Sequence, residues 1–347
     1  MWRQDVQMSR SVQASQQLHS RRSRLFLEIE ERGVSGFGEI APQPYLLNGD
    51  AGIDEVVDEV RAWIVAQLSD CVNREGGLPA WSRVARWAGP RAASNPAVAL
   101  VEMALLDREL NLAATAIEQL WVPIAETPLQ GTGSLIGAAD WTIAQNIARL
   151  RLKVEPGVLP VATLDRLAQV DVPVLLDFNC SANEDSEVID IVQALSGVCE
   201  VIGVEQPFAA GNVVEHARLA ERLDVAVSID EGVRSPRDID QIVRYRAAQI
   251  ICIKPARVGG LANSRTMIAR AKELGLRVYL GGFFESPFAR RVHRALANQA
   301  ILEPSDLGTV HVAGLEYFDE VMSVDSGFGL RPSPQLLERS RVIALSL

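Results

Sequence analysis

The segment from Ile147 to Lys254 contains five short runs that carry apolar residues and each end in a charged residue: IARLRLK (147–153), VLLD (174–177), VIGVE (201–205), VAVSID (225–230) and IICIK (250–254). These final charges are 24 to 28 residues apart, which is the length of one strand followed by one helix. Repeated strand–helix units are typical of a parallel (β/α) barrel. Because the charges end consecutive strands, they are predicted to gather on one rim, where barrel enzymes carry their catalytic groups.

The rest of the chain predicts a second, smaller domain. With 347 residues, the chain is longer than the roughly 250 of a typical (β/α)₈ barrel. A strand at 25–30 leads into a glycine-rich hairpin, and amphipathic helices are expected at 53–68 and 95–110. We therefore predict an α/β protein with a (β/α)-type barrel, that is, a modified TIM barrel. The proposed division is an α+β capping domain at 1–120, joined by the C-terminal tail 326–347, and a catalytic barrel at 121–325.

Alternating periodicities place the elements of the barrel. Strands are predicted at 149–154, 174–178, 201–205, 225–230, 249–254 and 277–280, and helices at 162–169, 184–195, 212–222, 236–243 and 261–274. The first strand is expected within 129–137 and the eighth within 301–312. After the seventh strand, Ser286 and Pro287 are expected to start a helix as N-cap and first helical residue.

Composition narrows the class of protein. The formal charge of −10 argues against nucleic acid or an anionic membrane surface as partner. No run approaches 18 apolar residues and the N-terminus lacks the apolar core of a signal peptide, so we expect neither a membrane span nor secretion. The four cysteines show no CxxC pairing and are expected to be reduced thiols of a cytoplasmic protein. A small carboxylate is the expected partner, and a homo-oligomer is left open.

Three carboxylates at adjacent strand ends indicate a metal site. Asp177, Glu205 and Asp230 can converge on one hard divalent cation, and an oxygen-only ligand set at a barrel mouth suits Mg²⁺. Zinc is not expected, because no His or Cys accompanies them. Each carboxylate alone would be read more readily as a strand-end ion pair. The register of all three favours the metal.

Two lysines flank this trio of carboxylates. Lys153 ends the strand before it and Lys254 the strand after it, which places them on opposite sides of the mouth. A lysine acts as a base only where its neutral form is favoured, and a fixed cation such as Arg151 on the same strand face acts in that direction. A metal with a lysine on each side suits removal of a proton α to a carboxylate. The alternative is that these are solvated strand-end charges.

The ordered motifs resemble those of the enolase superfamily, in particular its muconate-lactonizing subgroup. The resemblance covers residues 25–315, and the segment Gly36–Pro42 resembles the strand turn of that family's cap. The segment GGFFES (281–286), with Arg290, resembles the seventh-strand segment of o-succinylbenzoate synthases and N-succinylamino acid racemases. The barrel motifs that carry the resemblance are Arg151-x-Lys153, Asp177-x-Asn179, Glu205-Gln-Pro207, Asp230-Glu231 and Lys254-Pro255.

This resemblance implies roles for individual residues. Asp177, Glu205 and Asp230 would bind Mg²⁺, Lys153 would be the base, and Lys254 a cationic stabiliser or second acid/base. The implied substrate contacts are Arg151, Asn179, Gly282, Phe283, Glu285 and Ser286. The helix that starts at Pro287 is further expected to bind a second substrate carboxylate at its N-terminus, unless its N-cap merely satisfies the helix.

The favoured reaction is a lyase reaction, dehydration to o-succinylbenzoate, which belongs to menaquinone biosynthesis. The alternatives are an isomerase, either a racemase of N-succinylamino acids or an epimerase of dipeptides, or a cycloisomerase. An inactive binding protein on a barrel scaffold is the alternative of another class, disfavoured because both lysines and all three carboxylates are present. The chain departs from the family in having Arg151 for Lys, Phe283 for Met and Ala289 for Gly. Its N-terminus is short and polar where relatives have an apolar strand and a mobile lid.

Overall fold

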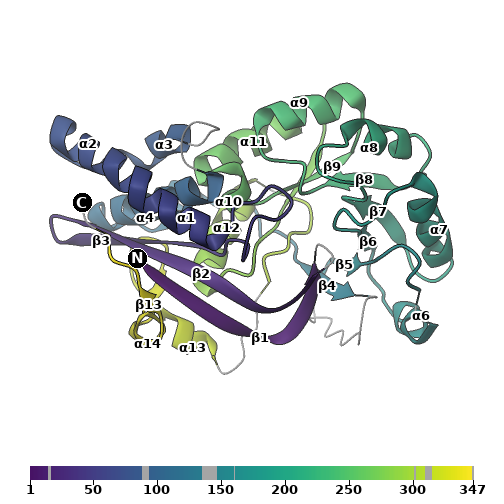
Figure 1. The fold of residues 1–347 in the computed structure, drawn as a ribbon, viewed down its shortest axis with the longest axis horizontal. Helices are drawn as coiled ribbons and strands as arrows, with labels where there is room; N and C mark the ends of the chain where they lie inside the picture. Colours follow the sequence, from purple (N-terminus) through teal and green to yellow (C-terminus); the bar gives the residue numbers. More distant parts are fainter. Residues whose placement is uncertain are drawn as a thin grey trace.

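The main sheet of the protein contains seven parallel strands whose order follows the chain (Figure 1). The computed structural model describes residues 1–14, 17–87, 94–134, 147–159, 161–300, 302–308 and 315–345. The strands are β4 (Gln130–Ser134), β5 (Arg149–Lys153), β6 (Val174–Asp177), β7 (Val201–Glu205), β8 (Ala226–Ile229), β9 (Ile250–Ile253) and β10 (Arg277–Leu280). The six strands predicted from 149 to 280 are confirmed, each within one residue at either end.

Helices cover the outer face of this curled sheet, so the predicted (β/α) barrel with a cap is confirmed as the fold class. The helices are α6 (Val161–Leu167), α7 (Asp185–Ser196), α8 (Val213–Ala220), α9 (Pro236–Tyr245), the short α10 (Pro255–Val258), α11 (Leu261–Glu273) and α12 (Pro287–Ala300). In β5, Leu150 and Leu152 belong to the large core between sheet and helices. The alternate residues of the strand therefore point into the barrel, where Arg151 and Lys153 reach the rim.

An irregular segment takes the eighth position of the barrel. Among residues 302–308 no regular strand forms, yet this segment bonds to both edges of the sheet. On the β10 side the amide of Asp306 donates to the carbonyl of Leu280 at 2.9 Å, and on the β4 side the amide of Gln130 donates to the carbonyl of Ser305 at 3.0 Å. The eighth strand expected within 301–312 is thus represented in 302–308 by a single parallel bridge from Ser305 to Leu129, and positions 301 and 309–312 lie outside the described residues. Pro304 lacks the N–H that a ladder needs.

The capping part has a four-stranded antiparallel sheet in the order β13-β1-β2-β3. Its elements are β1 (Trp2–Ala14), β2 (Gln17–Glu31), β3 (Val34–Ile40), α1 (Ile53–Glu59), the π-helical turn η1 (Val60–Ile64), α2 (Val65–Glu75), α3 (Trp81–Val84), η2 (Ala85–Trp87), α4 (Asn95–Leu112) and α5 (Ile117–Leu120). The C-terminal elements are α13 (Tyr317–Glu320), β11 (Val321–Ser323), β12 (Leu330–Pro332), α14 (Pro334–Glu338) and β13 (Arg341–Val342). The chain end returns to the cap because β13 pairs with β1.

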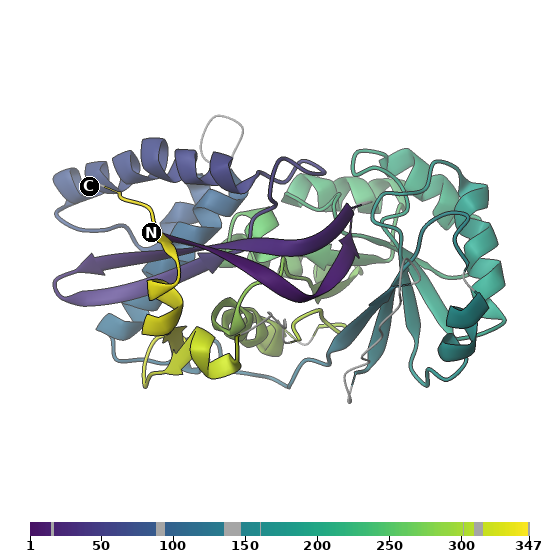
Figure 2. The same cartoon turned by 60° about the horizontal axis from the view of Figure 1, so that its bottom comes forward.

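The N-terminal residues correct one expectation from the sequence. The polar stretch was taken to lack the strand that relatives have, but β1 is a strand of 13 residues that pairs antiparallel with β2. Val6 and Met8 are buried along it, which is enough to fix one face. Figures 1 and 2 show this hairpin extending from the cap toward the barrel.

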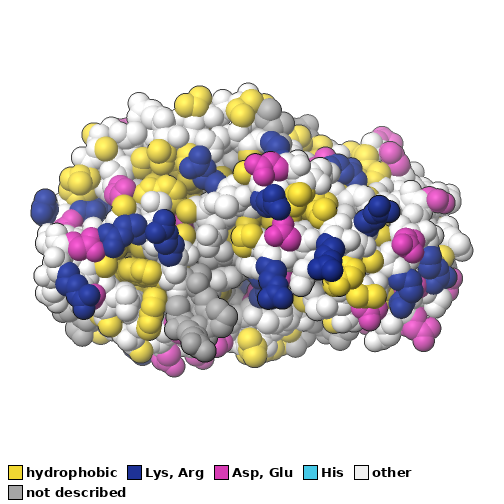
Figure 3. All heavy atoms as spheres, turned by 90° about the horizontal axis from the view of Figure 1, so that it is seen from above, with side chains coloured by type: hydrophobic (Ala, Val, Ile, Leu, Met, Phe, Trp, Pro, Cys, Tyr) yellow, Lys and Arg dark blue, Asp and Glu magenta, His cyan; other side chains and the backbone are white. Residues whose placement is uncertain are grey.

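No helix within the described ranges is long and apolar enough to cross a membrane. On the face drawn in Figure 3, the described acidic and basic side chains are interspersed.

Candidate active site

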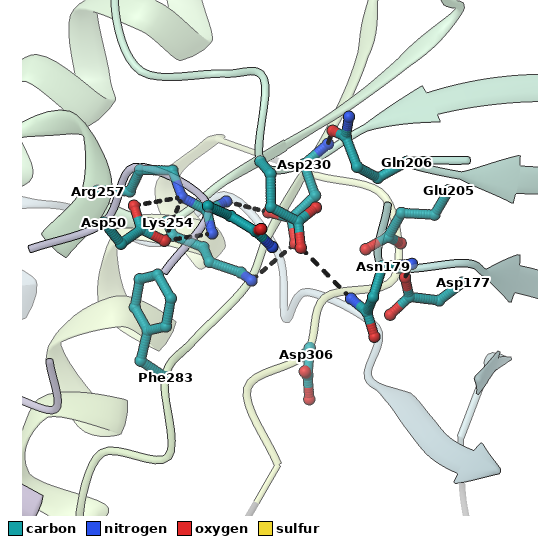
Figure 4. A network of polar contacts seen from close by, with 12 residues as sticks. Asp50, Asp177, Asn179, Glu205, Gln206, Asp230, Lys254, Arg257, Phe283 and Asp306 are labelled. Carbon is teal, nitrogen blue, oxygen red and sulfur yellow. Dashed lines mark hydrogen bonds and ion pairs between the residues drawn. The ribbon is translucent and has the colours of Figure 1, made fainter. Parts of the chain in front are cut away.

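The predicted rim residues gather at the carboxyl ends of the strands. Lys153, Asp177 and Glu205 are the last residues of β5, β6 and β7, and the strand register places Lys153 beside Asp177 and Asp177 beside Glu205. Asp230 directly follows β8, and Lys254 directly follows β9. All five side chains are buried. Figure 4 shows Asp177, Glu205 and Asp230 directed toward a shared space.

Each lysine is held by one strand-end carboxylate. Lys153 Nζ lies 3.0 Å from Asp177 Oδ2 and donates to Asn179 Oδ1 at 2.5 Å. On the other side of the mouth, Lys254 Nζ lies 2.7 Å from Asp230 Oδ2. The two amines therefore stand on opposite sides of the carboxylates, as the order of the strands predicts.

Arg151 fills the space between the first two carboxylates. Its Nη1 lies 3.2 Å from Glu205 Oε1 and 3.7 Å from Asp177 Oδ2. Its Nη2 donates to Asp306 Oδ2 at 2.8 Å. Sequence reasoning missed Asp306, because it lies on the irregular eighth segment and ends no apolar run. Arg151 thus balances charge at the rim and contacts three acids.

Negative charge is in excess at this mouth. The buried or partly buried acids Asp177, Glu205, Asp230, Glu231 and Asp306 outnumber the cations Arg151, Lys153, Lys254 and Arg257. Burial and the nearby Asp177 raise the pKa of Glu205 to about 7, and burial and Asp230 raise the pKa of Glu231 to about 7. Burial also acts to raise the pKa of Asp230, but Arg257 and Lys254 outweigh it and hold that pKa well below its usual value.

The rim carboxylates are of the chemical kind that a hard divalent cation prefers, although their present spacing does not form a metal site. In the described part of the chain, no three carboxylate, imidazole or thiolate groups are grouped closely enough to hold a metal ion. Instead, cationic nitrogens of Arg151, Lys153 and Lys254 lie against the rim carboxylates. Glu231 Oε2 is buried and has no hydrogen-bond partner among the described residues. Buried oxygen donors with uncompensated charge are what Mg²⁺ requires.

Strained backbone shapes the loops after two of these strands. Asn179, Cys180 and Gln206 have φ values of 44°, 65° and 38°, a region that non-glycine residues rarely adopt. The turn brings Asn179 Nδ2 to 3.4 Å from Glu231 Oε1 while its Oδ1 faces Lys153. Gln206 Oε1 accepts from the amide of Asp230 at 3.0 Å. The strain thus accompanies a network that ties neighbouring strand ends together.

The seventh-strand segment is only partly at the site. The ring centroid of Phe283 lies 4.8 Å from Lys254 Nζ, so Phe283 borders the mouth as predicted. Glu285 folds back, accepting from the amide of Phe283 at 2.9 Å and pairing with Arg290 at 3.2 Å. A Cβ at Gly282 would meet both Glu285 and Arg290 at 2.6 Å. The geometry therefore explains Gly282 and Glu285 by packing, and does not support their predicted substrate contacts.

The side chain of Ser286 contacts the cap and does not face the barrel mouth. It starts α12 as predicted, since its Oγ accepts from the amide of Phe288 at 3.2 Å. However, Glu39 of β3 occupies this helix terminus: Ser286 donates to it from its amide at 2.6 Å and its hydroxyl at 2.5 Å. Ser286 is fully buried. The expected anion site for a second substrate carboxylate was wrong, because the side chain of Glu39 already occupies this helix terminus.

Two further residues at the site were missed. Tyr279 of β10 stands inside the barrel and its hydroxyl donates to Glu205 Oε2. Arg257 of α10 donates to Asp230 Oδ1 and also contacts Asp50 of the cap. Tyr279 follows the alternation of a predicted strand, so its inward direction was readable from the sequence. For Asp50, the sequence offers only the preceding Asn48-Gly49 pair, which predicts a turn and no contact with the barrel.

A parallel barrel with acids at three consecutive strand ends, lysines on either side and an antiparallel cap defines a class of protein. Residues 137–333 match the family described as "Enolase C-terminal domain-like". The match covers more than half of the chain, and the protein belongs to this family.

Individual relatives agree with this class. An o-succinylbenzoate synthase from Enterococcus faecalis is 30% identical over 178 residues, 50% of this chain and 47% of that protein. An N-succinylamino acid racemase from Amycolatopsis is 28% identical over 209 residues, 57% of this chain and 56% of that protein. The matches thus span about half the length of these relatives. The structure of an enolase superfamily member from Listeria innocua superposes with a TM-score of 0.80 at 17% identity, covering 98% of this chain and 96% of that one.

Proposed function

We propose that this protein is a Mg²⁺-dependent lyase that removes a proton α to a carboxylate, with dehydration to o-succinylbenzoate as the favoured reaction. The observation that carries the proposal is the placement of Lys153 and Lys254 on opposite sides of three strand-end carboxylates. In this proposal a planar substrate lies between the two amines. The similarity to o-succinylbenzoate synthases supports the choice of reaction.

Each residue has a defined task in this reaction. Asp177, Glu205 and Asp230 would hold Mg²⁺, whose charge stabilises the substrate carboxylate as negative charge develops on it. Lys153 accepts the α-proton at Nζ, oriented by Asn179 Oδ1 at 2.5 Å. Lys254 stays protonated and stabilises the carbanion from the opposite face. The proton taken by Lys153 and the departing hydroxide together make one water molecule, so the dehydration is balanced.

Racemisation of an N-succinylamino acid is the second candidate. The similar placement of the two lysines favours it, since each lies close to one carboxylate, at 3.0 Å for Lys153 and 2.7 Å for Lys254. In this reaction one amine removes the α-proton and the other returns a proton to the opposite face. Both lysines then act as acid and base, and no group leaves the substrate.

Purified protein with Mg²⁺ would be assayed on the cyclohexadiene carboxylate precursor of o-succinylbenzoate and on a panel of N-succinylamino acids in heavy water. Dehydration, lost on chelation and in Lys153→Ala, supports the favoured reaction. Deuterium incorporation with loss of optical activity and no elimination would establish the racemase instead. Absence of both reactions, with intact folding, would refute both candidate reactions.

A further inference from the structure

Arg257 connects the cap to one of the rim carboxylates. Its Nη1 donates to Asp230 Oδ1 at 2.5 Å, while its Nε and Nη2 donate to the two carboxylate oxygens of Asp50 at 3.1 and 2.9 Å. Figure 4 shows the guanidinium between the two acids. All three side chains are at most 5% exposed, so water cannot screen their charges. The fork of an arginine suits such two-sided pairing.

Asp50 is held in place by a rigid turn. Leu47 and Asp50 exchange backbone hydrogen bonds at 3.1 and 2.8 Å around Asn48 and Gly49. These central residues have φ values of 50° and 81°, as a two-residue hairpin turn with left-handed centres requires. The turn therefore presents Asp50 in one orientation.

A second arginine clasps the same turn from the barrel side. Arg234 Nη1 donates to Gly49 O and to Asp50 Oδ1, both at 2.9 Å. A Cβ at position 49 would lie 3.2 Å from the Arg234 guanidinium, so a glycine there allows the close approach. Arg234 thus gives the Asp50 carboxylate a second cationic partner besides Arg257. Asp50 is thus built into the contact between the two parts of the chain.

We propose that Asp50 is a positioning residue for the cation site: it neutralises Arg257 and fixes its guanidinium against Asp230 Oδ1. This inference rests on the proposed function, in which Asp230 is a metal ligand. With Asp50 in place, Asp230 keeps one orientation and its second oxygen, Oδ2, remains on the side of Lys254 at the rim. Without Asp50, Arg257 carries an unbalanced positive charge beside Asp230, which opposes a divalent cation there.

The test is a calorimetric titration of substrate-free, full-length protein with Mg²⁺. Asp50→Asn is expected to weaken Mg²⁺ binding roughly 10–100-fold, the range for partners that orient a metal ligand. In an Arg257→Met background, adding Asp50→Asn is expected to change the Kd less than about 2-fold, because the charge that Asp50 neutralises is gone. Asp54→Asn is the matched control, since that carboxylate is 81% exposed and pairs with Arg3 of the cap. It should bind as wild type does.

Three results would overturn the inference. The first is wild-type affinity in Asp50→Asn. The second is equal weakening by Asp50→Asn with and without Arg257, which would mean a through-space effect of charge. If Asp50→Asn does not fold, as judged by far-UV circular dichroism, Arg257→Lys replaces it, because lysine keeps the positive charge but cannot pair with both acids as the guanidinium does. Unchanged Mg²⁺ binding in Arg257→Lys is the third result. Failure of the wild type itself to bind Mg²⁺ would instead refute the proposed function.

Discussion

Two groups of buried carboxylates in this protein differ in what neutralises them. At the barrel mouth, Asp177, Glu205 and Asp230 pair with the side chains of lysines and arginines. Between cap and barrel, Glu39 of β3 accepts backbone N–H groups at the start of α12, and Glu102 of α4 accepts those at the start of α11. The cap thus supplies a carboxylate to the N-termini of two barrel helices in succession.

The hydrogen-bond partners of the mouth carboxylates can change, whereas those of the interface acids Glu39 and Glu102 are fixed. Backbone donors at a helix start cannot turn away, so Glu39 and Glu102 have one arrangement. The fit around Glu102 is close, since a Cβ at Gly260 would lie 2.1 Å from its Oε2 and Gly260 has a φ of 108°. Lysine and arginine side chains can rotate and exchange their partners for a cation or a substrate. Burial of an acid therefore indicates function only where its partners are mobile.

The largest effect is expected from Lys153, the proposed base. Lys153→Ala should lower kcat by roughly 10²–10⁴-fold, the contribution typical of a positioned general base, while leaving the fold intact. Steady-state turnover on the active substrate measures this, with circular dichroism and a thermal melt as controls. Glu102→Gln is the matched interface variant and should keep its kcat. A Lys153→Ala enzyme with wild-type turnover would place the base elsewhere.

The interface acids Glu39 and Glu102 should contribute to the pH dependence of stability. Burial raises the pKa of Glu102 from 4.5 to about 8 and that of Glu39 from 4.5 to about 7. Between these values the folded state holds protons that the unfolded chain has lost, so the free energy of unfolding should fall as pH rises from about 4.5 to 8. The effect is at most ~1.4 kcal/mol for each unit of pKa.

Glu102→Gln should flatten this dependence, because the variant carries no titrating group there. Urea unfolding at pH 5, 6.5 and 8, with a chelator present, compares the slopes for wild type and variant. The stability advantage of wild type over the variant should shrink as pH increases. Parallel curves would mean that Glu102 stays ionised on its helix terminus.

Metal should distinguish the two groups of acids directly. Mg²⁺ at 100 times its Kd should stabilise the wild type by about 2.7 kcal/mol, and Glu205→Gln should lose most of this gain. Glu39→Gln should keep it, even if its starting stability is lower. Thermal melts with and without Mg²⁺ measure both. If Mg²⁺ stabilised Glu205→Gln and Glu39→Gln equally, the mouth and interface acids would not differ in metal binding.

The smallest effect is expected from Ser286. Its hydroxyl donates to Glu39 and caps α12, so Ser286→Ala should cost about 0.5–2 kcal/mol of stability. Substrate affinity should stay within about 2-fold of wild type, because Glu39 separates this position from the mouth. Denaturant unfolding and the KM for mono- and dicarboxylates test the two parts. If Ser286→Ala selectively lost dicarboxylate binding, the hypothesis of an anion site at the start of α12 would be supported after all.

The sequence by itself was enough to predict which residues meet at the rim of the barrel. A side chain at the end of a parallel strand points to the same edge as the ends of its neighbours, so the spacing of Lys153, Asp177, Glu205, Asp230 and Lys254 was enough to bring them together. Periodicity also predicted the strands and helices between them, since each buries one face locally. The polar N-terminus was misjudged because β1 gains its order from pairing with β2.

Only the tertiary structure decided what neutralises each acid. Glu39 and Ser286 are 247 positions apart, and Asp50 and Arg257 are 207 apart. Nothing in a local pattern relates such residues, because their contact depends on how the cap docks on the barrel. For the same reason Ser286 was assigned to the substrate when it belongs to the interface. Strand ends follow from the local period of the chain, but charge compensation depends on every neighbour in space.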